Sequence, residues 1–185
     1  MMDTIQIREQ LLAELDQNVL SPAEEDLMRI TDAIDEAKQI FFSASAREML
    51  VLSAFAMRVF HMGYKAYLIN ETKTPPIGQG DLLIILCGSG EGAIAGQVRT
   101  AQASGAKVLC ITAHPEGPVA QMCDYVIRFY GQTLADPVDD LPSFQPMGSS
   151  FEQAALVTLD YTVHLMMKKH NWEEPDLEVR HTNME

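Results

Sequence analysis

Short apolar runs alternate along the chain with longer segments in which apolar residues recur every three or four positions. The short runs predict β-strands, and the longer segments predict α-helices. These strands are apolar at nearly every position, which is typical of a parallel sheet that is covered on both faces. We expect five of them, over residues 40–45, 65–70, 81–87, 107–112 and 125–130.

The predicted helices separate the strands. They cover residues 47–62, 91–104 and 118–123, and a longer helix covers residues 149–170. A strand, a helix and another strand in this order favour right-handed crossovers within one parallel sheet. The chain is therefore predicted to have an α/β fold, with helices that flank a parallel sheet.

Two further helices are expected before the first strand. Apolar residues recur at roughly helical spacing over residues 5–19. The second helix is expected to begin at the sequence Ser-Pro-Ala-Glu. There Ser21 caps the helix, Pro22 takes its first position and Glu24 completes a capping box.

Two segments have no periodic pattern. Residues 131–148 are rich in Pro and Asp, and a loop of this length in a compact domain is often functional. Residues 172–185 are polar, and we expect them to be ordered only if they dock on the rest of the chain. The chain is thus predicted to be one domain over residues 1–185, with N-terminal helices over 1–39 and an α/β core over 40–171.

The composition is that of an ordinary soluble protein, since apolar residues make up 47% and charged residues 21% of the 185 residues. No apolar run approaches the ~20 residues that a membrane helix needs, and the N-terminus lacks the pattern of a signal peptide. The scattered Cys87, Cys110 and Cys123 favour reduced thiols in the cytoplasm over a disulfide framework or a zinc site.

The formal net charge of −13 argues against nucleic acid as a partner, because phosphate contacts need clustered Lys and Arg. A phosphorylated ligand would need local donors, such as backbone N–H groups. The glycine-rich turn at residues 88–90 follows a strand, where parallel sheets bind ligands. A tight turn without a ligand fits this stretch equally well. The turn matches neither the dinucleotide-binding pattern nor the Walker loop.

Three side chains are candidates for acid–base chemistry. Glu152, at the start of the last long helix, is either a general base aimed at the ligand cleft or an acid that complements the helix dipole. His61 ends a helix, where capping of the last carbonyl groups is the alternative role. His181 lies in the polar tail. No spacing of His, Cys and carboxylates resembles a metal site.

Four stretches together resemble one known family. They are residues 54–84, the sequence GSGEG at 88–92, QPMGSSFEQ at 145–153 and RHTNME at 180–185. With these the chain resembles 6-phospho-3-hexuloisomerase, in the sugar isomerase (SIS) domain superfamily. The resemblance implies a single SIS domain, a flavodoxin-like three-layer sandwich with a five-stranded parallel sheet, in a dimer or homotetramer.

The resemblance also implies a reaction. Members interconvert D-arabino-hex-3-ulose 6-phosphate and fructose 6-phosphate in the ribulose monophosphate pathway, through an enediol and without a metal or cofactor. Glu152 would be the base, and His61 and His181 would handle protons, His181 from a neighbouring subunit. The phosphate end would be held by Ser45, Arg47, Ser89, Gly90 and Glu91.

Two loops depart from the family pattern. Where the family has Gly-Ala-Gly-Arg-Ser-Gly, this chain has residues 44–49, in which Glu48 replaces the serine. In the second loop, Cys87 and Gly92 replace a serine and a threonine. If Glu48 faces the phosphate, its charge should repel the ligand by several kcal/mol in a poorly solvated site.

Two functions follow from these observations. Retention of Glu152 and His181 favours a sugar-phosphate isomerase. The altered loops favour a changed substrate, or a non-catalytic SIS protein that binds a sugar phosphate or related ligand as a sensor or assembly subunit.

Overall fold

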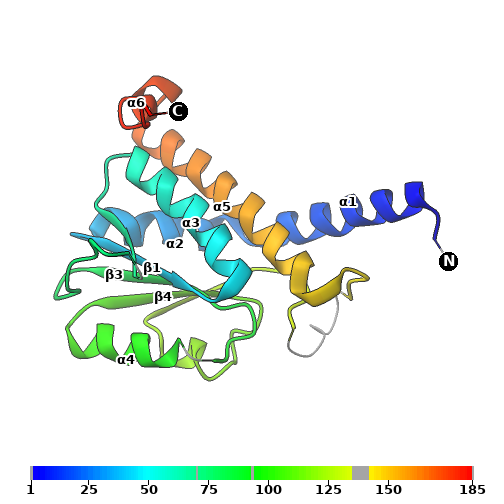
Figure 1. The fold of residues 1–185 in the computed structure, drawn as a ribbon, viewed down its shortest axis with the longest axis horizontal. Helices are drawn as coiled ribbons and strands as arrows, with labels where there is room; N and C mark the ends of the chain where they lie inside the picture. Colours follow the sequence, from blue (N-terminus) through cyan, green and yellow to red (C-terminus); the bar gives the residue numbers. More distant parts are fainter. Residues whose placement is uncertain (1, 70, 93, 135–141, 185) are drawn as a thin grey trace.

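The chain folds around a parallel β-sheet that helices cover on both faces (Figure 1). The structure is a computed structural model that describes residues 2–69, 71–92, 94–134 and 142–184. The strands are β1 (Ile40–Ala44), β2 (Ala66–Leu68), β3 (Leu82–Leu86), β4 (Lys107–Thr112) and β5 (Tyr125–Arg128). The helices are α1 (Thr4–Leu20), α2 (Glu24–Glu36), α3 (Ala46–His61), α4 (Ala95–Ala103), α5 (Ser149–His170) and α6 (Glu174–Glu178), with short 3-10 helices η1 (Ala120–Met122) and η2 (Pro146–Gly148).

The order of the strands in the sheet is β2-β1-β3-β4-β5, and every neighbouring pair is parallel. Phe42 of β1 pairs with Leu68 of β2 on one side and with Ile84 of β3 on the other. This is the flavodoxin-like order, so the predicted α/β fold class is confirmed. The order reverses between β1 and β3, and sheets of this kind bind ligands beyond the C-terminal ends of the strands at such a point.

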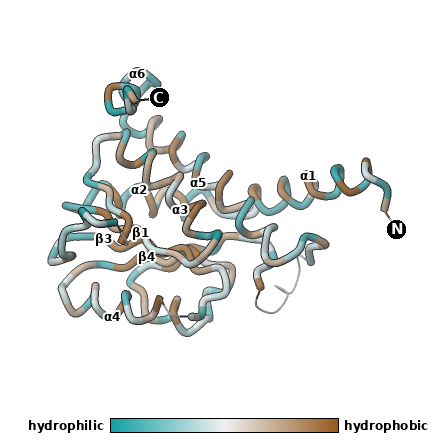
Figure 2. The backbone as a smooth tube through the Cα atoms, in the orientation of Figure 1, coloured by the Kyte–Doolittle hydropathy of each residue, from teal (hydrophilic) through white to brown (hydrophobic). Residues whose placement is uncertain are grey.

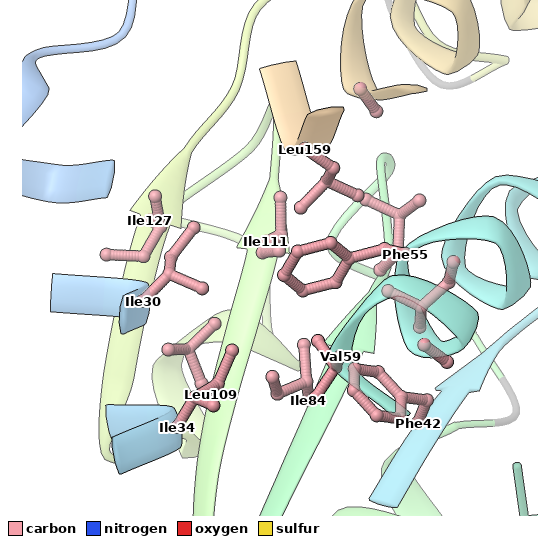
Figure 3. Packing of buried hydrophobic residues seen from close by; sticks show 14 of the residues in the cluster. Ile30, Ile34, Phe42, Phe55, Val59, Ile84, Leu109, Ile111, Ile127 and Leu159 are labelled. Carbon is pink, nitrogen blue, oxygen red and sulfur yellow. The ribbon is translucent and has the colours of Figure 1, made fainter. Parts of the chain in front are cut away.

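Successive residues of the central strands point to opposite faces of the sheet and enter two separate cores. In β3, Ile84 and Leu86 face the layer of α2, α3 and α5, whereas Leu83 and Ile85 face α4. Figure 3 shows Ile84 packed close to Val59 of α3 in the first of these cores. Because both faces are buried, β3 is apolar at every position.

The start of α2 differs from its prediction. No side chain caps this helix, and its N-cap residue is Ala23, so the predicted capping box is wrong. The hydroxyl group of Ser21 donates instead to the carbonyl oxygen of Gln17, at 2.7 Å. Ser21 therefore completes the end of α1 and does not begin α2.

The terminal helices lie outside the layers that cover the sheet. α1 projects from the body (Figures 1 and 2). The apolar side chains of Ile5 and Leu12 on this helix are exposed. Near its end, the side-chain amide of Asn18 donates to Oγ of Ser150, at 2.9 Å. At the other terminus, the guanidinium of Arg180 donates to the carbonyl oxygen of His61, at 3.2 Å. The polar tail, which the sequence predicts to be ordered only on docking, thus docks beside α3.

Candidate functional site

A cavity of about 190 Å³ lies where the first turns of α3 and α5 meet, beyond the C-terminal ends of β1 and β3. Four of the residues predicted from the sequence line it: Ser45, Arg47, Ser89 and Glu152. The other lining residues are Ala46, Glu48, Thr133, Leu134, Met147, Gly148 and Phe151. The fold thus brings segments that are distant in the sequence to the point where the strand order reverses.

An ion pair joins two sides of this cavity. Nε of Arg47 donates to Oε2 of Glu152, at 2.5 Å. The side chain of Glu152 is 12% exposed, whereas that of Arg47 is 62% exposed. The carboxylate is therefore shielded from water but open to a ligand in the cavity, where it can accept a proton. The guanidinium is available to a negative group of the same ligand.

Glu48 is directed into the glycine-rich turn after β3. Its Oε1 accepts a hydrogen bond from the backbone N–H of Gly88, at 2.8 Å. A Cβ atom at position 88 would lie 2.7 Å from Oε1 of Glu48 and 2.7 Å from Cε1 of Phe151. The close approach of Glu48 to the backbone therefore requires glycine at this position. Burial raises the pKa of the Glu48 carboxyl to about 7. The hydrogen bond from Gly88 lowers this pKa, and the negative charge of Glu152 raises it further.

Only part of the glycine-rich turn reaches the cavity. Ser89 lines the cavity, but Gly90 and Glu91 are not among its lining residues. Gly90, with φ of 66°, packs against the loop after β4, where a Cβ atom would come within 2.8 Å of a backbone carbonyl oxygen. Glu91 is exposed, and its carbonyl oxygen accepts from the thiol of Cys87 at 3.1 Å. α4 begins at Ala95, later than predicted, so the turn does not lead directly into the helix.

The backbone around the cavity is strained at two residues. Ala46 has φ of 47° and Met147 has φ of 60°, in the left-handed region that favours glycine. Such conformations cost of order 1–3 kcal/mol each and collect at functional sites. Ala46 begins α3 and Met147 lies in the turn before α5. The strain therefore lies in the two turns that carry Arg47 and Glu152.

Two residues that shape the site were not identified from the sequence. Thr133 is buried and lines the cavity, and its hydroxyl oxygen lies 3.2 Å from Nε2 of His114. Glu14 of α1 accepts hydrogen bonds from Oγ of Ser143 and from the side-chain amide of Gln145, at 2.6 and 3.0 Å. Glu14 thereby holds the loop before α5. These contacts join irregular segments, and no motif in the sequence marks them.

His61 and His181 lie in a different cavity. This cavity has a volume of about 990 Å³ and lies between α3, α5 and the C-terminal tail. The centroids of the two imidazole rings are 5.3 Å apart. Along α3, His61 is thirteen residues (61 minus 48) beyond Glu48, which corresponds to about 20 Å. Within one chain, the larger cavity therefore holds the histidines and the smaller one holds Glu152.

Three further features concern metal binding, membrane helices and disulfide bonds. Among the described residues, no group of three or more His, Cys, Asp or Glu side chains is arranged to hold a metal ion. In the same part of the chain, no helix combines the length and the apolar character needed to cross a bilayer. Cys87, Cys110 and Cys123 are free thiols.

The SIS domain family matches residues 33–155, so this chain is a SIS domain protein. Its parallel α/β sandwich, with a cavity at the reversal of strand order, agrees with this class. The chain is 32% identical to 3-hexulose-6-phosphate isomerase from Bacillus subtilis, over 100% of both chains. It is also 32% identical to the protein of that name from Methylomonas aminofaciens, over 85% of this chain and 86% of that one.

A solved structure extends this similarity. It is that of a Methanococcus jannaschii protein for which a molecular function of 3-hexulose-6-phosphate isomerase was inferred. The TM-score is 0.81 at 29% identity, over 94% of this chain and 98% of the other. The chain belongs to the 3-hexulose-6-phosphate isomerase (6-phospho-3-hexuloisomerase) family, so the resemblance seen in its sequence is confirmed.

Proposed function

We propose that this protein is an isomerase that interconverts D-arabino-hex-3-ulose 6-phosphate and fructose 6-phosphate. The chain is 32% identical, over its full length, to a protein named 3-hexulose-6-phosphate isomerase, and this similarity supports the choice of these two sugars. The structural observation that carries the proposal is the shielded carboxylate of Glu152, which opens on the cavity beside Arg47. A non-catalytic binding protein is not favoured, because several relatives that match over most of this chain are named 3-hexulose-6-phosphate isomerase.

Glu152 acts as the base. It removes the proton from C2 of the 3-ulose, and the electron pair forms a 2,3-enediolate. The proton returns to C3, the hydroxyl proton of O2 passes to O3, and the carbonyl group is then at C2. One carboxylate can perform both transfers at carbon. The guanidinium of Arg47, 2.5 Å from Glu152, stabilises the negative charge that develops on the enediolate oxygens.

The phosphate end of the sugar lies toward the two loops. Ser45 and Ser89 line the cavity and offer hydroxyl donors, and Arg47 offers a charge. Gly90 and Glu91 act through the backbone, since they form the turn that presents Ser89; the Glu91 N–H donates to Oγ of Ser89 at 3.3 Å. The cytoplasm and the ribulose monophosphate pathway are the setting that we propose for this reaction.

His61 and His181 take part from a neighbouring subunit. Their distance from Glu152 within one chain means that they can reach the reacting oxygens only if the larger cavity of one copy opens on the smaller cavity of another. Exposed apolar side chains on α3, including Leu50 and Phe60, support such an assembly. The proton between O2 and O3 would then pass through an imidazole.

A coupled assay tests this proposal. Wild-type protein should form fructose 6-phosphate from D-arabino-hex-3-ulose 6-phosphate, detected through glucose 6-phosphate and NADPH. Glu152→Gln keeps the shape of the side chain and removes its basicity, so kcat should fall by at least ~10². Glu116→Gln is the matched control, because it changes an exposed carboxylate that also lies beyond the C-terminal end of a strand, after β4. Folded wild-type protein without turnover, or a Glu152→Gln variant with full activity, would contradict the proposal.

A further inference from the structure

Gly88 is the first residue of the glycine-rich turn, at the end of the sheet where parallel α/β proteins bind ligands. It follows the C-terminal end of β3, next to the reversal of strand order, and it belongs to the turn that carries Ser89. In this structure the partner of the Gly88 backbone N–H is a side chain of the protein itself, Oε1 of Glu48, at 2.8 Å. The carboxylate group thus occupies a backbone donor directly before Ser89, and both Glu48 and Ser89 line the cavity.

The charged side chains around the cavity determine how a phosphate group would interact with it. Among the described residues that line it, the charged side chains are Arg47, Glu48 and Glu152. Arg47 is already paired with Glu152. When both carboxyl groups are ionised, the lining carries a net charge of −1, and a doubly charged phosphate would enter a cavity of its own sign.

We propose that Glu48 is an internal competitor for the phosphate group of the substrate: its carboxylate holds the Gly88 N–H and must be neutralised by a proton, and leave that donor, before the phosphate binds. Glu48 thereby sets how tightly this member of the family holds a phosphorylated sugar. The inference rests on the proposed function, because it concerns how that substrate binds.

The surroundings of Glu48 support the uptake of a proton. Burial raises the pKa of its carboxyl to about 7, and the charge of Glu152, on α5, acts in the same direction. The thiol of Cys87, at the end of β3, adds no charge at neutral pH, because burial and Glu48 itself raise its pKa to about 11. Arg47 on α3 engages Glu152, and His114, after β4, contacts Thr133. Neutralisation of Glu48 near pH 7 therefore removes one negative charge from the lining.

Calorimetric binding of sulfate and of fructose 6-phosphate tests this inference. Sulfate keeps its double charge over the whole range, so a change in its affinity with pH comes from the protein. From pH 8.5 to 6.5 the protonated fraction of a group with a pKa of about 7 rises roughly 25-fold, and wild-type affinity for sulfate should rise by a similar factor.

Two variants separate the charge of Glu48 from its occupation of the donor. Glu48→Gln removes the charge but can still accept from Gly88, so it should lose the dependence on pH and bind roughly tenfold more tightly than wild type at pH 8.5. Glu48→Ser also vacates the donor, so it should bind more tightly still, for both ligands. Glu116→Gln is the control and should keep the wild-type dependence on pH.

The outcomes also separate this inference from the proposed function. If wild type turns over the 3-ulose but both Glu48 variants bind with unchanged affinity and unchanged dependence on pH, the competitor role is wrong and the isomerase stands. If binding tightens in both variants while no turnover occurs, the competitor role stands and the isomerase is wrong. If neither wild type nor any variant binds the ligands, and their circular dichroism spectra show that all are folded, the competitor role is also wrong.

Discussion

Nε of Arg47 lies 2.5 Å from Oε2 of Glu152, and this ion pair links the first turn of α3 to the first turn of α5. The two residues are 105 positions apart in the sequence. Their meeting depends on the parallel direction of the strands, which places the start of α3, after β1, and the loop from β5 to α5 at the same end of the sheet. The pair therefore gives the proposed base both a position and a cationic partner.

Loss of Arg47 should affect both substrate binding and turnover. Arg47→Met removes the charge that faces the phosphate and the enediolate, so kcat/KM should fall by at least about tenfold. Arg47→Lys should restore part of the loss, because it returns the charge without the planar guanidinium. Steady-state kinetics at two salt concentrations measure this. Equal kcat/KM in wild type and Arg47→Met would show that the ion pair has no part in the reaction.

The stability of the protein should depend on Glu48 in a defined range of pH. Burial raises the pKa of this carboxyl from 4.5 to about 7, so between these values the folded protein holds a proton that the unfolded chain has released. The contribution of Glu48 to the free energy of unfolding therefore falls as the pH rises through this range, by roughly 3 kcal/mol.

Urea unfolding of wild type and of Glu48→Gln at several values of pH measures this contribution. The free energy of unfolding of the variant, relative to wild type, should increase between about pH 4.5 and 8, since the variant has no charge to bury. A difference between the two proteins that stays constant over this range would mean that Glu48 is solvated in the folded state.

Assembly should bury the apolar side chains that a single chain leaves in water. On α3, Leu50 is 72% and Phe60 is 49% exposed, and on α5 Tyr161 is 42% exposed. Apolar side chains at this density on two adjacent helices favour contact with a second copy of the chain. Light scattering at micromolar concentration should give the mass of a dimer or a tetramer, and Phe60→Glu should lower it. A monomeric wild type would exclude the shared site.

Mixed oligomers test whether one site uses residues of two subunits. Glu152→Gln and His61→Asn should each be nearly inactive alone. If each site combines Glu152 of one copy with His61 of another, unfolding and refolding the two variants together should restore about one quarter of the sites. Each variant refolded alone is the control. Activity that does not recover in mixed oligomers of native mass would place both residues' roles within one subunit.

The sequence predicts the elements of the fold well where one local pattern decides them. The bounds of β4 and α5 agree with the prediction to the residue, because an unbroken apolar run and a long periodic segment leave no alternative. The start of α2 was mispredicted, because the hydroxyl of Ser21 has two possible backbone partners, and the sequence does not say that it bonds back to Gln17.

The candidate site is predicted less completely, because it depends on contacts between distant segments. Glu152, Arg47 and Ser89 were identified as site residues, and they line one cavity. Glu48 is directed toward Gly88, forty residues further along the chain, because β1 and β3 are neighbours in the sheet, and no local pattern encodes this contact. The placement of His61 away from Glu152 likewise follows from the length of α3.

Exchange of solvent deuterium into fructose 6-phosphate tests the proposed reaction most directly. Removal of a proton next to the C2 carbonyl can occur at C1, as in an aldose–ketose isomerase, or at C3, as a 2,3-enediol requires. In deuterium oxide, wild-type protein should replace hydrogen by deuterium at C3 and not at C1, observed by proton NMR. Glu152→Gln should slow this exchange by at least ~10². Exchange at C1, or exchange at C3 that is as fast in Glu152→Gln as in wild type, would contradict a 2,3-enediol formed by Glu152.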